Sequence, residues 1–263
     1  MTRPKSIKPL GEADEYIRMM IVADPGFGKT VFYGTATKGL FLTTDPEGTL
    51  SAKRMGSTCD EWRVKEAKEL TEAYLWLKNE GHNEYEWVFI DNTTEAQSLM
   101  MKESMDNARK RNPSRDEYVP GLDDHQRSQL MIVDFVKKFN DLPMNVGYTA
   151  HTTIRDDAEG NPIVTAAIHG REGAVANQIM GYMNILGFGE VVERGDEEIR
   201  RIWFTHHNGF KGKDRYQVLG KSRDGLTIPR LERLVSQQPA ATPATKKAAP
   251  ARRPAATTTR RSK

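Results

Sequence analysis

The 263-residue sequence predicts a doubly wound α/β fold, with a mainly parallel, twisted sheet flanked by helices and extended at one edge by antiparallel strands. The first observation behind this prediction is that short apolar runs alternate with segments of helical spacing over most of the chain. The second is that polar residues follow directly after several apolar runs, as they do at the carboxyl edge of a parallel sheet. The third is a late pair of apolar runs, 185–192 and 199–205, whose short connection predicts an antiparallel pair.

In chain order, strands are expected at residues 16–22, 40–44, 62–64, 87–91, 144–150, 185–192 and 199–205. Helices are expected at residues 28–37, 66–79, 92–105, 126–139 and 175–183. The helix at 66–79 illustrates the reasoning, because its apolar residues recur at helical spacing and Gly81 follows its end. Residues 107–124 are polar and predict a loop between two helices. Residues 152–174 form a long insert, in which Gly160-Asn161-Pro162 is a turn signal that favours a flexible hairpin.

The most specific motif lies between the first strand and the first helix, where the sequence reads A-D-P-G-F-G-K-T. It matches the phosphate-binding loop G-x-x-x-x-G-K-[ST], with Ala23 in place of the first glycine. Backbone N–H groups would bind phosphate there, Lys29 would reach the β- and γ-phosphates, and the Thr30 hydroxyl would ligate Mg²⁺. An ordinary Gly/Pro turn is the alternative, which the preceding strand and the Lys-Thr pair disfavour. The residues expected to bind nucleotide are Asp24, Pro25, Gly26, Phe27, Gly28, Lys29, Thr30 and Val31.

A second motif follows further along the chain, where an apolar strand at residues 87–90 ends on Asp91. In proteins with a phosphate-binding loop, a carboxylate at the end of a nearby strand holds a Mg²⁺-bound water. Four apolar residues before an aspartate are common in protein sequences. The pattern is therefore informative here only because a phosphate-binding loop precedes it. Thr30 and Asp91 are therefore the expected metal-binding residues, with ATP and Mg²⁺ as the expected ligands.

Composition restricts the class of protein. The hydrophobic content is 37% and the mean hydropathy is −0.66, which are polar values for a single compact domain. No apolar run approaches the roughly 18 residues that a membrane span needs, and the N-terminus lacks an apolar signal segment, so a cytoplasmic protein without membrane contact is expected. The single cysteine, Cys59, excludes a disulfide within the chain.

The charge distribution divides the chain into a polar arm at 1–14, a folded core at 15–235 and a basic tail at 236–263. The tail holds 7 of the 39 Lys and Arg residues and none of the 36 Asp and Glu residues, which leaves 32 basic residues and a net charge of −4 elsewhere. Rich in Ala, Pro and Thr, it is predicted to be disordered. Its charge favours a contact with nucleic acid or an acidic partner, and solubility or spacing is the alternative.

Together these residues resemble a RecA-type ATPase core over residues 16–234. More closely, they resemble the short phage-encoded RecA-like proteins of the single-strand annealing group, an AAA-type nucleotide-binding phage family. The resemblance rests on A-D-P-G-F-G-K-T, L-F-L-T-T-D-P-E-G, W-V-F-I-D-N-T-T-E, Y-T-A-H and K-G-K-D-R, in that order. Only the first is specific by itself. The resemblance implies a RecA-like P-loop NTPase fold and, for a phage protein, a location in the host cytoplasm.

The resemblance also implies catalytic roles, which with Lys29 give the expected catalytic residues. Asp45 occupies the position of the acidic residue that activates the attacking water, and Glu47 is a near alternative. The family residue is usually glutamate, so an aspartate leaves the rate of hydrolysis open. His151 stands where the family keeps a polar residue that contacts the γ-phosphate and passes its state to a DNA-binding loop. For Asp45 a turn-capping role, and for His151 a strand-capping role, are the alternatives.

The loops after Met105 and His151 correspond to the two loops that bind single-stranded DNA in the family. The residues that this correspondence assigns to DNA phosphates are Arg109, Lys110, Arg111, Arg155 and Arg171. A solvated charged face is the alternative for any one of them. Lys213 and Arg215 match a K-x-R element that reaches a neighbouring subunit's γ-phosphate, which implies a homo-oligomeric ring or filament; a basic turn is the alternative.

These observations favour an ATP-dependent, single-stranded-DNA-binding ATPase that promotes annealing or strand exchange in phage recombination. A non-hydrolysing module clamped by ATP is a second hypothesis, and a small-molecule kinase is a third, disfavoured because no Arg-rich lid is apparent. The sequence leaves open the subunit number, duplex binding, the nucleotide base preferred and a single-strand-binding protein as helper.

Overall fold

The computed structural model describes residues 15–45, 47–157 and 159–237. The expected arm at 1–14 and nearly all of the expected tail lie outside these residues, apart from Ser236 and Gln237 at its start. In the described part of the chain, no helix is both long and apolar enough to cross a membrane.

A nine-stranded sheet forms the centre of the molecule, with the strand order β13-β9-β8-β1-β5-β4-β2-β3 and β12 paired to β8. Its strands are β1 (Arg18–Ala23), β2 (Gly39–Thr43), β3 (Asp60–Arg63), β4 (Trp87–Asp91), β5 (Asn145–Ala150), β8 (Ile185–Arg194), β9 (Glu197–Trp203), β12 (Lys213–Asp214) and β13 (Ser222–Asp224). The pairs from β8 through β1, β5, β4 and β2 to β3 are parallel. The pairs of β9 with β8, β13 with β9 and β12 with β8 are antiparallel. The predicted fold class, including its antiparallel edge, is confirmed.

Helices cover both faces of this sheet because side chains along each central strand alternate between two cores. Met19 and Ile21 of β1 belong to one core, together with residues of α1 (Lys29–Tyr33) and α7 (Ile228–Ser236). Met20 and Val22 belong to the other core, which the longer helices cover. Those helices are α3 (Ala67–Asn79), α4 (Thr93–Arg111), α5 (Leu122–Asn140) and α6 (Ala174–Tyr182). The remaining short helices are α2 (Leu50–Arg54), η2 (Gly81–Asn83) and η3 (Arg171–Gly173).

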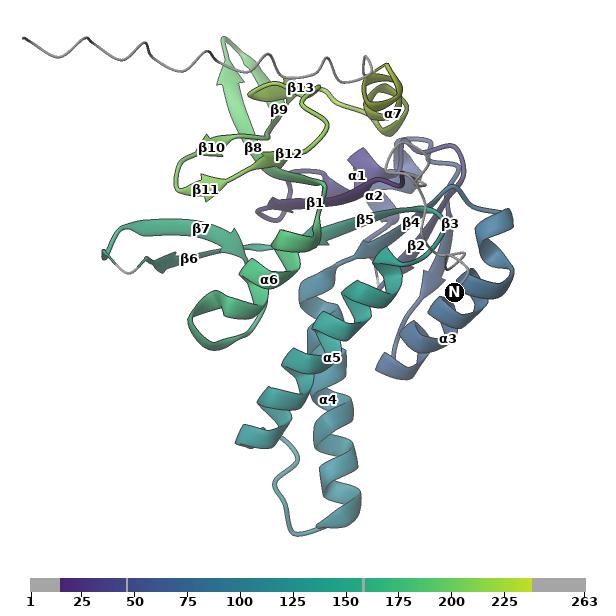
Figure 1. Cartoon of the computed structure of the whole chain (residues 1–263), viewed down its shortest axis with the longest axis vertical. Coiled ribbons are helices and arrows are strands. Elements are labelled where there is room, and N and C mark those ends of the chain that lie inside the picture. The colour runs from purple at the N-terminus through teal and green to yellow at the C-terminus, as the bar shows by residue number, and fades with distance from the viewer. Residues whose placement is uncertain (1–14, 46, 158, 238–263) are drawn as a thin grey trace, which may run out of the picture.

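The structure corrects the predicted end of the helix expected at residues 92–105, which is α4. The segment 107–124 was expected to be a loop, but α4 continues to Arg111 and α5 begins at Leu122. Helix continues past residue 105 because one side of α4 stays buried against α5, where Ser104 donates a hydrogen bond to Asp124. Arg109, Lys110 and Arg111 therefore occupy the last turn of a helix. Figure 1 shows α4 and α5 as a pair that projects from the sheet, with their connection at the far end.

The insert after β5 forms the expected hairpin, from β6 (Thr152–Asp156) and β7 (Pro162–Ala166). The Asp157 side chain accepts a hydrogen bond from the backbone N–H of Asn161, which closes the turn. A second small hairpin of β10 (His206–His207) and β11 (Phe210–Lys211) lies against β7, since the N–H of Val164 donates to the carbonyl of Gly209. Figure 1 shows the β6–β7 hairpin projecting from the sheet separately from α4 and α5.

Candidate functional site

The phosphate-binding motif forms the loop between β1 and α1, as the sequence predicts. Gly26 and Gly28 have φ values of 86° and 95°, a backbone region that other residues adopt only with strain. Phe27 anchors the loop between them because its ring is buried against β8, where a Cβ on Gly189 would lie 2.5 Å from it. The loop is thus held at the carboxyl ends of two neighbouring parallel strands, where ligands of open α/β sheets bind.

Lys29 lies across the beginning of this loop. Its Nζ donates hydrogen bonds to the carbonyl oxygens of Ala23, at 2.8 Å, and Asp24, at 3.1 Å. Burial lowers the pKa of Lys29, and the nearby carboxylates of Asp91 and Asp24 oppose that effect. A buried ammonium beside backbone N–H groups is suited to bind a polyanion rather than a neutral ligand.

Asp91 lies at the end of β4 and is joined to the phosphate loop by a short hydrogen bond. The Thr30 hydroxyl donates to its Oδ2 at 2.6 Å, and the Thr149 hydroxyl of β5 donates to its Oδ1 at 2.6 Å. Burial raises the pKa of Asp91, whereas both hydroxyls and Lys29 act to lower it. A carboxylate and a threonine hydroxyl in contact at this edge are oxygen ligands of the kind that Mg²⁺ prefers, so the residues present fit that ion. Thr149 was missed in the sequence, although it lies within the Y-T-A-H motif.

His151 directly follows β5 and is half-buried beside the same groups. Its Nε2 lies 3.3 Å from Nδ2 of Asn92, and its Nδ1 has no hydrogen-bond partner among the described residues. Burial, together with the positive charge of Lys29, lowers the pKa of His151. The structure therefore brings Lys29, Asp91 and His151 together at the carboxyl edge of the sheet.

Asp45 and Glu47 follow β2 at the same edge, and both side chains are exposed. Asp45 lies near enough that its charge contributes to the raised pKa of Asp91. One of its carboxylate oxygens accepts the N–H of Glu47 at 3.2 Å, which is a turn-capping contact. The geometry is compatible with a water-activating carboxylate and also with the turn-capping alternative.

Lys213 and Arg215 lie at the opposite end of the sheet from the phosphate loop of their own chain. Lys213 pairs with Leu186 near the beginning of β8, whereas the loop follows the far end of β1. Lys213 Nζ donates to the carbonyls of Met180 and Gly181 at 3.1 and 3.0 Å, and Arg215 donates to that of Gly181 at 3.4 Å. Both residues thus cap the end of α6 in this chain. Their contact with a neighbouring subunit stays a prediction.

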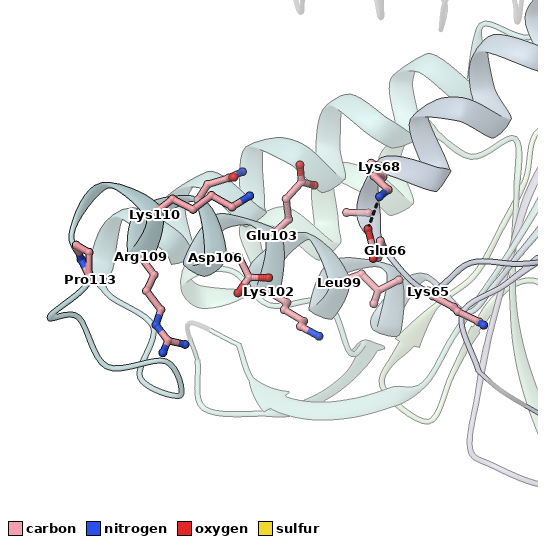
Figure 2. Close-up of a pocket in the computed structure, with 12 residues that line it drawn as sticks. Lys65, Glu66, Lys68, Leu99, Lys102, Glu103, Asp106, Arg109, Lys110 and Pro113 are labelled. Carbon is pink, nitrogen blue, oxygen red and sulfur yellow. Dashed lines mark ion pairs between the residues drawn. The ribbon is translucent and has the colours of Figure 1, made fainter.

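Two of the three basic residues at the end of α4, Arg109 and Lys110, line a groove of about 700 Å³ between α4 and the beginning of α3. Figure 2 shows Arg109 and Lys110 in this groove with Lys65, Lys68 and Lys102. The acidic residues of the groove are Glu66, Glu103 and Asp106, and Glu66 pairs with Lys68 at 2.7 Å. Arg111 instead donates from its Nε to the carbonyl of Asn107 at 3.2 Å. Because three of the five cations come from outside the predicted loop, sequence reasoning missed most of this surface.

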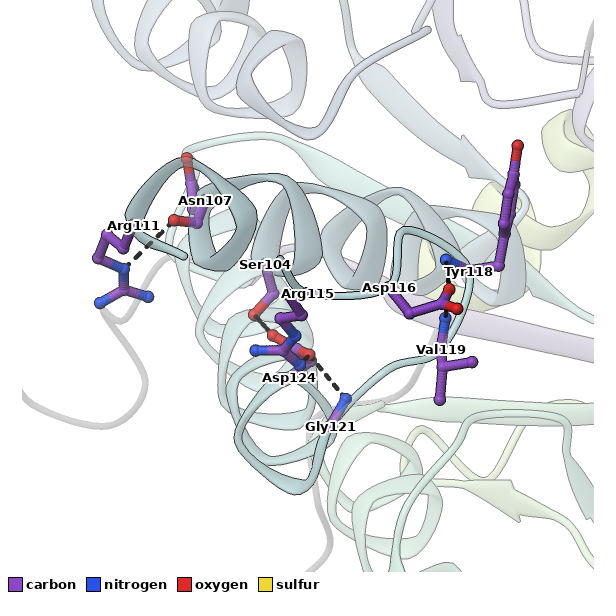
Figure 3. Close-up of polar contacts among 9 residues, drawn as sticks. All are labelled: Ser104, Asn107, Arg111, Arg115, Asp116, Tyr118, Val119, Gly121 and Asp124. Atoms are coloured by element: carbon purple, nitrogen blue, oxygen red, sulfur yellow. Dashed lines mark hydrogen bonds and ion pairs between the residues drawn. The ribbon is translucent and has the colours of Figure 1, made fainter. Parts of the chain in front are cut away.

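The α4–α5 connection is held by carboxylates, as Figure 3 shows. Asp124 is buried and accepts hydrogen bonds from Ser104, Arg115 and the N–H of Gly121. Asp116 accepts the N–H of Tyr118, whose side chain is 82% exposed. Arg109 is engaged in an ion pair with Glu117 across the same connection, so its charge is already compensated in part.

Arg155 and Arg171 occupy a second location, where the turn end of β6 contacts the η3 segment. Arg155 donates to the carbonyl of Glu172, and its other guanidinium nitrogen donates to Asn177 at 3.1 Å. The Arg171 side chain is 91% exposed and lies 3.4 Å from the Glu172 carboxylate. The five basic residues expected to bind DNA thus fall into two groups, one on α4 and one near the hairpin.

The hairpin region contacts the nucleotide site at one point and α4 at another. The Thr152 hydroxyl, at the start of β6, donates to the carboxylate of Asp24 in the phosphate loop. Gln97, buried on α4, donates to the carbonyl of His169 at 2.9 Å and accepts its N–H at 2.7 Å. Gln97 had no sequence signal, because only the fold brings α4 against the segment after β7.

The phosphate loop follows a strand of a parallel sheet, and a threonine and an aspartate are in contact beside it. This arrangement defines a nucleotide site of the P-loop NTPase type. Residues 15–216 match the model of a family described as an AAA domain, and the chain belongs to that family. The match supports a nucleotide-binding ATPase. No curated protein matches the chain significantly.

Proposed function

We propose that this chain is a DNA-stimulated ATPase that binds single-stranded DNA and promotes annealing or strand exchange in phage recombination. Family membership supports the nucleotide-binding part. The observation that carries the DNA part is the direct contact between the phosphate loop and the hairpin that follows His151, through Asp24 and Thr152. A change at the nucleotide therefore has a short route to the segment that bears Arg155.

The nucleotide-site residues divide into binding and reacting groups in this proposal. Lys29 exchanges its two carbonyl partners for phosphate oxygens when ATP enters the loop. Thr30 and Asp91 would hold Mg²⁺, which would supply positive charge beside the phosphates. Asp45, or Glu47 beside it, orients the attacking water and accepts its proton. His151 donates a hydrogen bond to the γ-phosphate from one ring nitrogen, which a neutral imidazole can do.

DNA phosphates are assigned to the groove on α4 and to the surface where β6 contacts η3 and α6. Arg109, Lys110 and Arg111 lie at or beside the groove, and Arg155 and Arg171 lie near the hairpin. Arg155 would have to leave its Glu172 contact to bind DNA, so nucleotide-dependent release of that contact provides a switch. In an assembled ring or filament, Lys213 and Arg215 of one subunit would face the γ-phosphate of the next.

Measuring ATP hydrolysis with and without single-stranded DNA tests the proposal. We expect DNA to stimulate hydrolysis by the wild-type protein. The Lys29→Ala variant should lose both this stimulation and ATP-dependent DNA binding. Hydrolysis that is indifferent to DNA would leave a P-loop ATPase without the proposed DNA role.

A DNA-binding module that ATP clamps without hydrolysis is the second candidate. The contact of the Asp45 carboxylate with the N–H of Glu47 favours it, because a turn-capping carboxylate is poorly placed to activate water. Turnover in Asp45→Asn and Glu47→Gln separates the two functions. Equal, near-zero rates in both variants and the wild type support the clamp, and a selective loss in one variant identifies the catalytic carboxylate.

A further inference from the structure

The phosphate loop has a contact from the antiparallel edge of the sheet that its own motif does not explain. Arg200 of β9 donates a hydrogen bond from Nε to the carbonyl oxygen of Phe27 at 2.7 Å. The same side chain lies over Gly28, where an added Cβ would be 3.2 Å from Arg200 Nε and 3.4 Å from its Cδ. An arginine 173 positions away in sequence thus rests on the centre of the loop.

Arg200 reaches the loop from the side opposite to the metal-binding residues. Its strand lies beyond β8, whereas Asp91 and Thr149 lie on β4 and β5, on the other side of β1. Among the described residues, no carboxylate forms an ion pair with Arg200, although its neighbour Arg201 pairs with Asp224 at 2.6 Å. Arg200 is exposed, and its bond to Phe27 is the one hydrogen bond that its side chain makes with the described residues.

We infer that Arg200 is a positioning residue for nucleotide binding, which fixes the Phe27–Gly28 peptide so that the N–H of Gly28 points toward the phosphate. In a planar trans peptide the carbonyl oxygen and the following N–H point in opposite directions. Holding the Phe27 oxygen on the β9 side therefore turns the Gly28 N–H toward the side of Asp91. A hydrogen bond from a guanidinium is charge-assisted and resists rotation of that peptide more strongly than a neutral donor would.

This inference deepens the nucleotide-binding part of the proposed function and is independent of the DNA part. It follows that Arg200 contributes to nucleotide affinity through Gly28 and without touching the reacting atoms. Interactions that are equally strong before and during the reaction change KM and leave kcat unchanged. A KM effect without a kcat effect is therefore the signature of this role.

Three variants test the inference in the full-length protein. Arg200→Ala removes the bond and the charge, Arg200→Gln keeps a neutral donor, and Arg200→Lys keeps the charge. Arg194→Ala is the matched control, because it removes the same charge from the same β8–β9 hairpin without contacting the loop. ATP binding in the presence of Mg²⁺ is measured by calorimetry without DNA, and KM and kcat are measured in the ATPase assay.

Arg200→Ala is expected to bind ATP about 10- to 100-fold more weakly, the range for loss of a hydrogen bond that involves a charged group. Its KM should rise in parallel, with kcat within about twofold of the wild type. Arg200→Lys and Arg200→Gln should fall between Ala and the wild type, and Arg194→Ala should match the wild type. Without nucleotide, all variants should melt together, whereas added ATP should raise the melting temperature of Arg200→Ala less than that of the others.

Equal ATP affinity in Arg200→Ala and the wild type would overturn the inference, as would a fall in kcat with unchanged KM. If Arg200→Ala does not fold, the ATP affinities of Arg200→Lys and Arg200→Gln are compared with that of the wild type, and equal affinities would overturn the inference. If DNA does not stimulate hydrolysis by the wild-type protein, the proposed DNA role of the chain is wrong, but the inference about Arg200 still stands. A wild-type protein that bound no nucleotide would overturn both.

Discussion

Replacing Thr149 by valine tests whether the buried Asp91 carboxylate is charged and held by its neighbours. Valine has nearly the shape of threonine but cannot donate the 2.6 Å hydrogen bond to Asp91. Hydrogen bonds to charged groups contribute about 1.5–3 kcal/mol, and Asp91 is only 6% exposed, so solvent replaces little of this loss. For a domain of this size, each kcal/mol shifts the melting temperature by about 2–4 °C, which gives an expected decrease of roughly 3–12 °C at neutral pH. Thr149→Ser, which keeps the hydroxyl, is the matched control.

The pH dependence of this loss has a definite sign. Burial raises the pKa of Asp91, so the folded state holds a proton more tightly than the unfolded chain does. The free energy of unfolding therefore falls as the pH rises from the ordinary aspartate pKa through the raised one. Removing the Thr149 donor raises the pKa of Asp91 further, so the difference between the valine and serine variants should be largest at neutral pH and shrink as the pH is lowered. Melting curves recorded between neutral and mildly acidic pH measure it. Equal melting temperatures for both variants at neutral pH would refute the reasoning.

Three further predictions concern coupling, assembly and the tail. Replacing Gln97 by alanine breaks both hydrogen bonds to His169, so DNA stimulation of the ATPase should fall several-fold while the basal rate stays within twofold; an unchanged stimulation ratio would exclude a coupling role. If Lys213 acts on a neighbouring subunit, mixing a Lys213→Ala, Arg215→Ala double variant with inactive Lys29→Ala protein should restore turnover, because some interfaces then combine two intact halves; no recovery over a range of mixing ratios would oppose action in trans. Deleting residues 238–263, which leaves α7 complete, should lower the log–log salt slope of DNA binding by about 0.7 for each lost phosphate contact, and an identical slope would show that the tail makes none.

Local patterns were sufficient to predict the mainly parallel sheet and the contact between the phosphate loop and the end of β4. The strand that ends on Asp91 and the loop that ends on Thr30 each follow from a short stretch of sequence, and parallel pairing then brings the two residues together. The prediction for the last turn of α4 was wrong, because a run of charged residues such as Lys110 favours a loop when the packing partner of the helix is unknown. That partner is α5, and its buried Asp124 receives the Ser104 hydrogen bond only in the folded chain.

The rest of the site depends on contacts between residues distant in sequence. Arg200 is one of several arginines on a charged hairpin, and only the antiparallel register of β9 brings it to Phe27. Gln97 is an ordinary polar residue on a helix until the segment after β7 lies against it. Neither residue type nor spacing distinguishes such positions from solvated ones.

The two carbonyl bonds of Lys29 have a consequence for which molecules the site accepts. The ammonium is already satisfied by the oxygens of Ala23 and Asp24, so an incoming ligand must compete with groups that never diffuse away. A hydrogen bond from an ammonium to a phosphate is stronger than one to a neutral carbonyl, whereas one to a ribose hydroxyl or a base is not. We therefore expect the loop to bind polyphosphates in preference to nucleosides, before any group recognises the base.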